Sequence, residues 1–181
     1  ATNDFCDGGT VICVIDSRAA AGTMVLLIRR AQALMEAAGD DGDFDALCQQ
    51  LHRYQATLRT CFTLENFDNL IKNGRMRPIV GTLLRSLGIH IIADATAEGT
   101  IHVADKARGV GKTYRAITAL MKASKDCTDA EVVISHCENL EGAMALKRQI
   151  LADLPVKQVD LLSCRGLTSF YAMEKGLIVG Y

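Results

Sequence analysis

Apolar positions along the chain follow two different spacings, which separate strands from helices. Residues 11–15 (VICVI) form a continuous apolar run rich in β-branched residues, and Asp16-Ser17 follows it. Such a run predicts a buried, parallel strand. From about residue 18 to residue 38, apolar side chains recur at helical spacing until Gly39. This pattern predicts a helix that begins directly after the strand and ends at the glycine.

The rest of the chain continues to alternate between the two spacings. Asp43 precedes a second apolar stripe and predicts the N-cap of a second helix. Residues 89–107 alternate in polarity around Glu98-Gly99, which predicts a hairpin with its turn there. The other expected strands cover residues 60–64, 131–136, 156–162 and 176–181, and the other expected helices cover residues 65–72, 79–87, 111–124 and 140–152.

This order of elements predicts an α/β protein in which helices cover a sheet. The first half is dominated by helices, and the hairpin marks a change of character in the second half. A boundary between two lobes is therefore expected between residues 75 and 88. We place it so that residues 1–80 and 81–181 form the two lobes.

The amino-acid composition argues against several classes of function. Lys and Arg number 20 against 21 Asp and Glu, aromatic residues are 5% and Trp is absent. A chain without net positive charge or stacking aromatics is not expected to bind nucleic acid. The apolar stretch Val25 to Ile28 runs into two arginines, and no segment approaches the roughly 20 apolar residues of a membrane span. We expect a soluble protein without stable membrane insertion.

The cysteines indicate a reducing compartment. They are seven, an odd number, with no C-x-x-C pair and no apolar leader before them. The expected location is therefore cytoplasmic. Most of these cysteines lie in apolar runs, where a free thiol behaves as a small buried hydrophobe. Their positions are Cys6, Cys13, Cys48, Cys61, Cys127, Cys137 and Cys164.

The segment Gly109-Val110-Gly111-Lys112-Thr113 ends like a phosphate-binding P-loop. A P-loop has a further glycine five positions before its second one, whereas this chain has Lys106 there. We interpret the segment as a turn that opens a helix.

Other catalytic or metal-binding patterns are missing from the sequence. His90, His102 and His136-Cys137 lack the paired spacing of a zinc site, and we expect His90 and His102 to face each other across the hairpin. No serine lies in a G-x-S-x-G elbow. The sequence therefore predicts no metal, no cofactor and no catalytic residue.

Asp16-Ser17 is a different kind of candidate, because ligands of open α/β sheets lie beyond the carboxyl ends of strands. The Ser17 hydroxyl and the free N–H groups of the following helix would together bind a carboxylate or phosphate. Alternatively, Ser17 is only the N-cap of that helix. Both interpretations stay open from the residues alone.

Five segments in order carry a resemblance to a known family. They are VIDSRAAAG, LENFDNLIKNGRM, ADKARGVGKTYRAI, VVISHCEN and GLIVGY. The chain resembles the C-terminal two-thirds of the DegV family of bacterial fatty-acid-binding proteins. The resemblance implies a parallel-sheet lobe and a second α/β lobe with a mixed or antiparallel sheet, which enclose an acyl chain. It also implies a carrier without enzymatic activity, which presents the carboxylate of a long-chain fatty acid to a separate fatty-acid kinase.

The resemblance also implies roles for particular residues. Ser17 matches the family's carboxylate-binding serine, and Arg75 and Arg108 match arginines near the head group and the kinase-facing surface. Many members have a histidine near the C-terminus that helps to hold the carboxylate, but residues 169–176 contain none. We expect Tyr171 to supply a hydroxyl in its place.

The chain also departs from the family at its start, because the part of the first lobe that precedes the VIDS segment is absent. We therefore expect that lobe to be truncated, with an exposed apolar edge at residues 11–15. Two other functions remain as alternatives. One is a nucleotide-using phosphotransfer enzyme built on residues 109–113, and the other is a regulatory interaction domain with a degenerate pocket.

Overall fold

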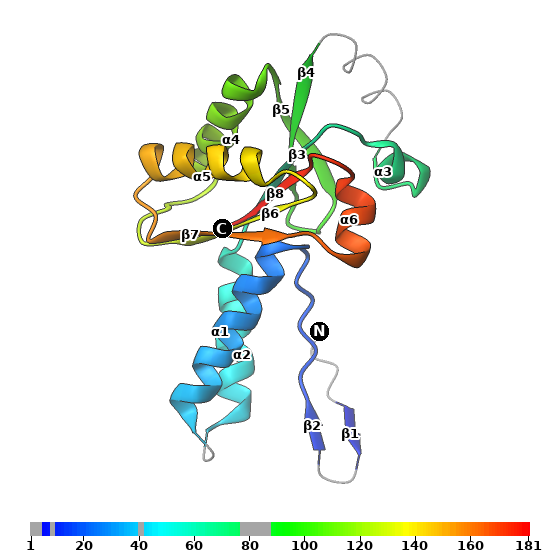
Figure 1. Cartoon of the computed structure of the whole chain (residues 1–181). Coiled ribbons are helices and arrows are strands. Elements are labelled where there is room, and N and C mark those ends of the chain that lie inside the picture. The colour runs from blue at the N-terminus through cyan, green and yellow to red at the C-terminus, as the bar shows by residue number, and fades with distance from the viewer. Residues whose placement is uncertain (1–4, 8–9, 40–41, 77–87) are drawn as a thin grey trace.

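The computed structural model describes residues 5–7, 10–39, 42–76 and 88–181. Its centre is a six-stranded sheet with strand order β5-β4-β3-β8-β6-β7 (Figure 1). These strands are β3 (Thr60–Leu64), β4 (Ile89–Ala95), β5 (Ile101–Arg108), β6 (Glu131–His136), β7 (Gln158–Ser163) and β8 (Leu177–Gly180). Only β6 and β7 pair in parallel within this sheet, and the other neighbours are antiparallel. The predicted α/β class with a mixed sheet is confirmed.

Helices cover both faces of the sheet. Successive residues of β3 point to opposite faces, and Cys61 packs in the cluster of α4 (Val110–Ser124) and α5 (Leu140–Asp153). Its neighbour Phe62 packs on the other side, against α3 and α6. These two helices are short, with bounds Asp68–Lys72 for α3 and Gly166–Ala172 for α6. The sheet is thus the middle of three layers.

The first two helices form a hairpin that extends from one end of the sheet (Figure 1). They are α1 (Gly22–Ala38) and α2 (Phe44–Thr57). A Cβ atom on Gly22 would lie 2.5 Å from the carbonyl oxygen of Val133, so the start of α1 packs directly on the sheet backbone. The Asp43 carboxylate accepts a hydrogen bond from the Ala46 N–H at 3.1 Å, which confirms the predicted N-cap.

The predicted buried, parallel strand at residues 11–15 is wrong in this structure. β2 (Thr10–Ile12) pairs only with β1 (Phe5–Asp7), in an antiparallel two-stranded sheet apart from the central one (Figure 1). Val11, Ile12 and Val14 are 51%, 47% and 54% exposed. The physical reason is that, among the described residues, β2 pairs with β1 alone and no packed layer covers these apolar side chains. The expected exposed apolar edge is therefore present.

Other differences concern element boundaries. α1 begins at Gly22 instead of residue 18. Arg18 and Ala21 have positive φ angles of 48° and 55°, and a right-handed helix cannot include residues with such angles. The helix expected at residues 79–87 and the proposed lobe boundary at residue 80 lie outside the described residues. β3, from before that boundary, belongs to the same sheet as β4 and β8.

Six cysteines carry free thiols in the described part of the chain, namely Cys13, Cys48, Cys61, Cys127, Cys137 and Cys164. Cys48, Cys61 and Cys127 are buried, as expected for small hydrophobes, and the other three are partly buried. Burial strongly raises the pKa of the Cys61 thiol. Among the described residues, the helices are too short or too polar to cross a membrane.

Candidate functional site

An apolar pocket opens on the face of the sheet that α3 and α6 cover, and we call it the α6 pocket. Its volume is about 590 Å³. Strands, short helices and loops contribute its apolar walls, which include Phe62, Leu64, Leu70, Ile101, Leu167 and Ile178. Residues 18–20 and the turn between β4 and β5 also contribute to the wall. A pocket of this size with mainly apolar walls suits a small apolar or amphiphilic ligand.

Arg75 and Tyr171 line the α6 pocket and contact each other. The guanidinium carbon of Arg75 lies 4.8 Å from the centroid of the Tyr171 ring, within cation–π distance. The backbone positions Arg75, because its N–H donates to the Leu70 carbonyl at 2.8 Å at the end of α3. Its side chain is exposed, and its Nη1 group donates to the Asn73 carbonyl at 3.3 Å. A guanidinium beside an apolar pocket is suited to an amphiphile with an anionic head group.

Ser17 lies beside the pocket but does not cap α1. Its hydroxyl donates to the Ala19 carbonyl at 3.2 Å and accepts from the Ala19 N–H at 3.4 Å, so it closes a local turn. The N-cap of α1 is Ala21, four residues further along. The N-cap interpretation of Ser17 is therefore wrong, because the helix begins too late. The next residue, Arg18, lines the pocket.

The structure does not bring Arg108 to the α6 pocket. Arg108 ends β5, whereas the pocket is lined by Ile101 at the start of that strand. The two residues are seven positions apart along the strand, which corresponds to about 23 Å. Arg108 is exposed, two residues before the first residue of α4. Of the four predicted site residues, two are thus in contact, one is adjacent and one is distant.

Sequence reasoning missed the residues that build the pocket walls. Leu167 lies on α6, a helix of seven residues that the apolar pattern did not predict. Phe62, Ile101 and Ile178 lie on strands that were predicted correctly, but as parts of a core. Period-two alternation on these strands identifies the face that each side chain occupies. It does not show that the cover on that face leaves a pocket.

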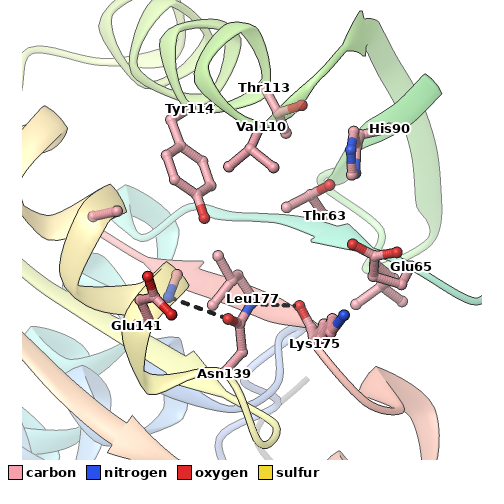
Figure 2. A pocket seen from close by; sticks show the side chains of 13 residues that line it. Thr63, Glu65, His90, Val110, Thr113, Tyr114, Asn139, Glu141, Lys175 and Leu177 are labelled. Atoms are coloured by element: carbon pink, nitrogen blue, oxygen red, sulfur yellow. Dashed lines mark hydrogen bonds between the residues drawn. The ribbon is translucent and has the colours of Figure 1, made fainter. Parts of the chain in front are cut away.

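A second pocket, of about 320 Å³, lies on the opposite face between the first turns of α4 and α5. Figure 2 shows the Tyr114 hydroxyl pointing into it, with Glu141 and Asn139 on the α5 side and Glu65 across. Burial raises the pKa of Tyr114, and the Glu65 and Glu141 carboxylates raise it further. The Asn139 amide is already used, because it accepts from the Gly142 N–H at 3.1 Å and donates to the Lys175 carbonyl at 2.8 Å. This pocket is more polar than the α6 pocket.

The P-loop-like segment is the start of α4, as interpreted from the sequence. The N–H groups of Lys112 and Thr113 donate to the Gly109 carbonyl at 3.2 and 3.1 Å, so they are helical bonds and do not face a ligand. The Thr113 hydroxyl bonds the same carbonyl at 3.1 Å. Two of the polar groups that a P-loop would use are therefore occupied.

The expected pairing of His90 with His102 is wrong. In the register of the hairpin His90 lies opposite Ala107, and His102 lies opposite Asp94. The His102 Nδ1 atom is 2.9 Å from the Asp94 carboxylate. Within the described ranges, no group of three or more His, Cys, Asp or Glu side chains is placed to hold a metal ion.

Known proteins resemble this chain in sequence over most of its length. The sequence model of the DegV family, described as "Uncharacterised protein, DegV family", matches residues 2–176. A DegV domain-containing protein of Streptococcus gordonii is 32% identical over 171 residues, which are 94% of this chain and 59% of that protein. A relative from Streptococcus pneumoniae is 33% identical and covers 95% of this chain and 60% of its own length. The chain thus spans about three-fifths of the length of these relatives.

Solved structures agree with the sequence comparison. A DegV family protein from Eubacterium eligens loaded with heptadecanoic acid has a TM-score of 0.85 and 26% identity, covering 93% of this chain and 59% of its own. The Fatty Acid Kinase (Fak) B3 protein of Streptococcus pneumoniae, loaded with linoleic acid, has a TM-score of 0.83 and 32% identity, with coverages of 93% and 58%. The match of the family's sequence model to nearly the whole chain, supported by these folds, shows that the chain belongs to the DegV family.

Proposed function

We propose that the α6 pocket holds the acyl chain of a long-chain fatty acid and that the protein presents the carboxylate to a fatty-acid kinase. The observation that carries this proposal is the combination of apolar walls with the Arg75–Tyr171 pair at one pocket. Burial of methylene groups against such walls contributes about 0.8 kcal/mol each. The similar proteins loaded with heptadecanoic and linoleic acid support the same ligand class.

The head group is the part of the ligand that needs polar partners. The Arg75 guanidinium offers forked donors for a carboxylate, and its contact with the Tyr171 ring restricts where those donors point. We assign Ser17 as a further carboxylate ligand, with its hydroxyl released from the local turn with Ala19. Tyr171 supplies its ring and its hydroxyl to the same end of the pocket.

The partner kinase supplies the chemistry in this proposal, and the chain acts as the carrier. Arg108 lies at the other end of the β4–β5 hairpin. We therefore propose that it contacts the kinase and not the fatty acid. The nucleotide-using alternative loses support, because helical bonds occupy the backbone N–H groups of Lys112 and Thr113.

The proposal is tested by fatty-acid binding to the full-length protein. Native mass spectrometry with lipid extraction should find a co-purifying fatty acid. Leu167 is 70% exposed and lines the pocket, so Leu167→Asp places a charge on the pocket wall without disturbing a core. The new Asp carboxylate would lie beside the methylene groups of the acyl chain and would repel the carboxylate of the fatty acid, so we expect about tenfold weaker binding.

Leu151→Asp is the matched control. Leu151 is 48% exposed on α5 and lines neither described pocket. This variant should bind fatty acid as the wild type does. Equal binding by the Leu167 and Leu151 variants would show that the ligand occupies another place.

A further inference from the structure

The α6 pocket is closed on one side by a segment that belongs to neither the sheet nor the helices. Residues 13–20 have no regular secondary structure and connect β2 to α1 (Figure 1). Arg18, Ala19 and Ala20 from this segment line the pocket. The β4–β5 turn lies next to them and contributes Gly99 and Thr100 to the same wall. We call residues 16–20 the strap.

One side chain attaches the strap to the turn. The Arg18 Nη1 group donates to the Ala97 carbonyl at 3.0 Å, across 79 residues of sequence. The two backbones are also in contact, because a Cβ atom on Gly99 would lie 3.3 Å from the Arg18 Cα atom. The φ angle of Gly99 is +79°, a conformation that disfavours any larger residue. Arg18 is thus the link between strap and turn.

At the opposite side of the strap, α2 holds its backbone. The Gln55 Nε2 group donates to the Ser17 carbonyl at 3.3 Å. Asp16 accepts the Arg18 N–H at 3.0 Å, and its carboxylate lies 3.8 Å from the Arg18 Nε atom. The φ angle of Arg18 is 48°, in the left-handed region that a residue with a side chain rarely adopts. The strap therefore depends on these few contacts to keep its conformation.

These contacts are also weak enough to break. The side chains of Arg18 and Asp16 are 53% and 79% exposed, and water screens such pairs strongly. A segment with few buried contacts opens locally at a small free-energy cost. The strap carries Ser17 and forms a wall of the pocket. Opening of the strap would therefore widen the pocket and at the same time move Ser17, which we propose binds the carboxylate.

We propose that Arg18 is a positioning residue that fastens the strap to the Ala97 carbonyl and so controls how fast a bound fatty acid leaves the α6 pocket. This inference rests on the proposed function of that pocket. Release of the Arg18 guanidinium from the turn is the step that opens the wall for entry and exit. Arg18 acts through the strap and needs no contact with the carboxylate.

The test measures dissociation of cis-parinaric acid, a fluorescent fatty acid, from the full-length protein by stopped flow with excess oleic acid as competitor. Arg18→Ala removes the hydrogen bond to Ala97, so the dissociation rate constant should rise about threefold to tenfold. Arg18→Lys keeps a donor and should give an intermediate rate. Gly99→Ala, which crowds the Arg18 backbone, should also speed dissociation.

Arg53→Ala is the control, because Arg53 is exposed on α2 and, among the described residues, its side chain donates to the Gln49 carbonyl of its own helix. It should dissociate at the wild-type rate. If Leu167→Asp weakens binding while Arg18→Ala dissociates within about twofold of wild type, the strap proposal is wrong and the fatty-acid site stands. If the wild type binds no parinaric acid, or Leu167→Asp binds normally, the proposed function fails first.

Discussion

The two faces of the central sheet differ in how completely they are covered. On one face α4 and α5, with 15 and 14 residues, pack side chains such as Ile117 and Leu146 that are 0% exposed. On the other face α3 and α6 have only 5 and 7 residues, and Leu167 of α6 is 70% exposed. The start of α1 also packs on this second face, where Leu26 and Val133 share a small buried cluster, but the part covered by α3 and α6 has room for a pocket.

This difference indicates a division between stability and binding. Cores reach their stability by close packing, which leaves no space for a ligand. A pocket requires missing contacts, and another part of the molecule must offset their loss. Here the same strands serve both purposes, because Cys61 and Phe62 are sequence neighbours that face the closed core and the open pocket. Substitutions on the two faces should therefore separate the two properties.

The largest expected effect is on the α4/α5 face. Leu146→Ala removes a fully buried side chain from the closed core, which should lower the free energy of unfolding by about 2–5 kcal/mol. The α6 pocket lies across the sheet, so fatty-acid affinity of the folded protein should not change. Urea unfolding and parinaric acid titration on the same variant measure both. A large loss of fatty-acid affinity in fully folded Leu146→Ala protein would contradict the idea that one face provides stability and the other provides binding.

Ser17→Ala should have a smaller effect, with the opposite signature. Among the described residues the hydroxyl bonds Ala19 within a loop, so the free energy of unfolding should change by less than about 0.5 kcal/mol. Loss of a charge-assisted hydrogen bond to the carboxylate should weaken fatty-acid binding about tenfold. Ser17→Thr keeps the hydroxyl and is the control. Unchanged affinity in the alanine variant would remove Ser17 from the site.

Tyr171→Phe tests the smallest effect, at the rim of the pocket. The ring under Arg75 remains, so the cation–π contact of about 0.5–1 kcal/mol should persist and stability should not change. Only the hydroxyl is lost, and because water competes for the carboxylate at the rim of the pocket, its hydrogen bond should contribute about 1 kcal/mol, which is about fivefold in affinity. Isothermal titration calorimetry with a soluble fatty acid measures this difference. Wild-type affinity would show that Tyr171 serves only as a platform for Arg75.

Sequence patterns predicted the well-covered part of the fold much better than the part that surrounds the pocket. The strand at residues 60–64 and the helices at residues 111–124 and 140–152 appear almost at their expected bounds. Their apolar periodicity reflects direct packing between sheet and helices. The hairpin with Gly99 in its turn was also local enough to be predicted, because a positive φ angle favours glycine.

The failures share a dependence on distant neighbours. The run at residues 11–15 has the composition of a buried strand, but burial needs a place inside a covered sheet, and among the described residues β2 pairs with β1 alone. Ser17 follows that run as expected, yet the left-handed angles of Arg18 and Ala21 delay the helix beyond its reach. The pocket joins residues from 18 to 178. No spacing rule in the sequence shows that these segments meet around an open space.

The buried thiol of Cys61 has a practical consequence for following the opening of the sheet. It lies on β3, between β4 and β8, with no exposed surface and a raised pKa. The thiolate is the nucleophile that attacks an alkylating reagent, so this sulfur reacts only after the central strand separates from its neighbours. Cys13, which is partly buried in the segment before the strap, needs no such event. Alkylation of Cys13 therefore reports movement of the segment before the strap, whereas alkylation of Cys61 reports separation of the sheet strands. Mass spectrometry of the same sample distinguishes the two modified cysteines.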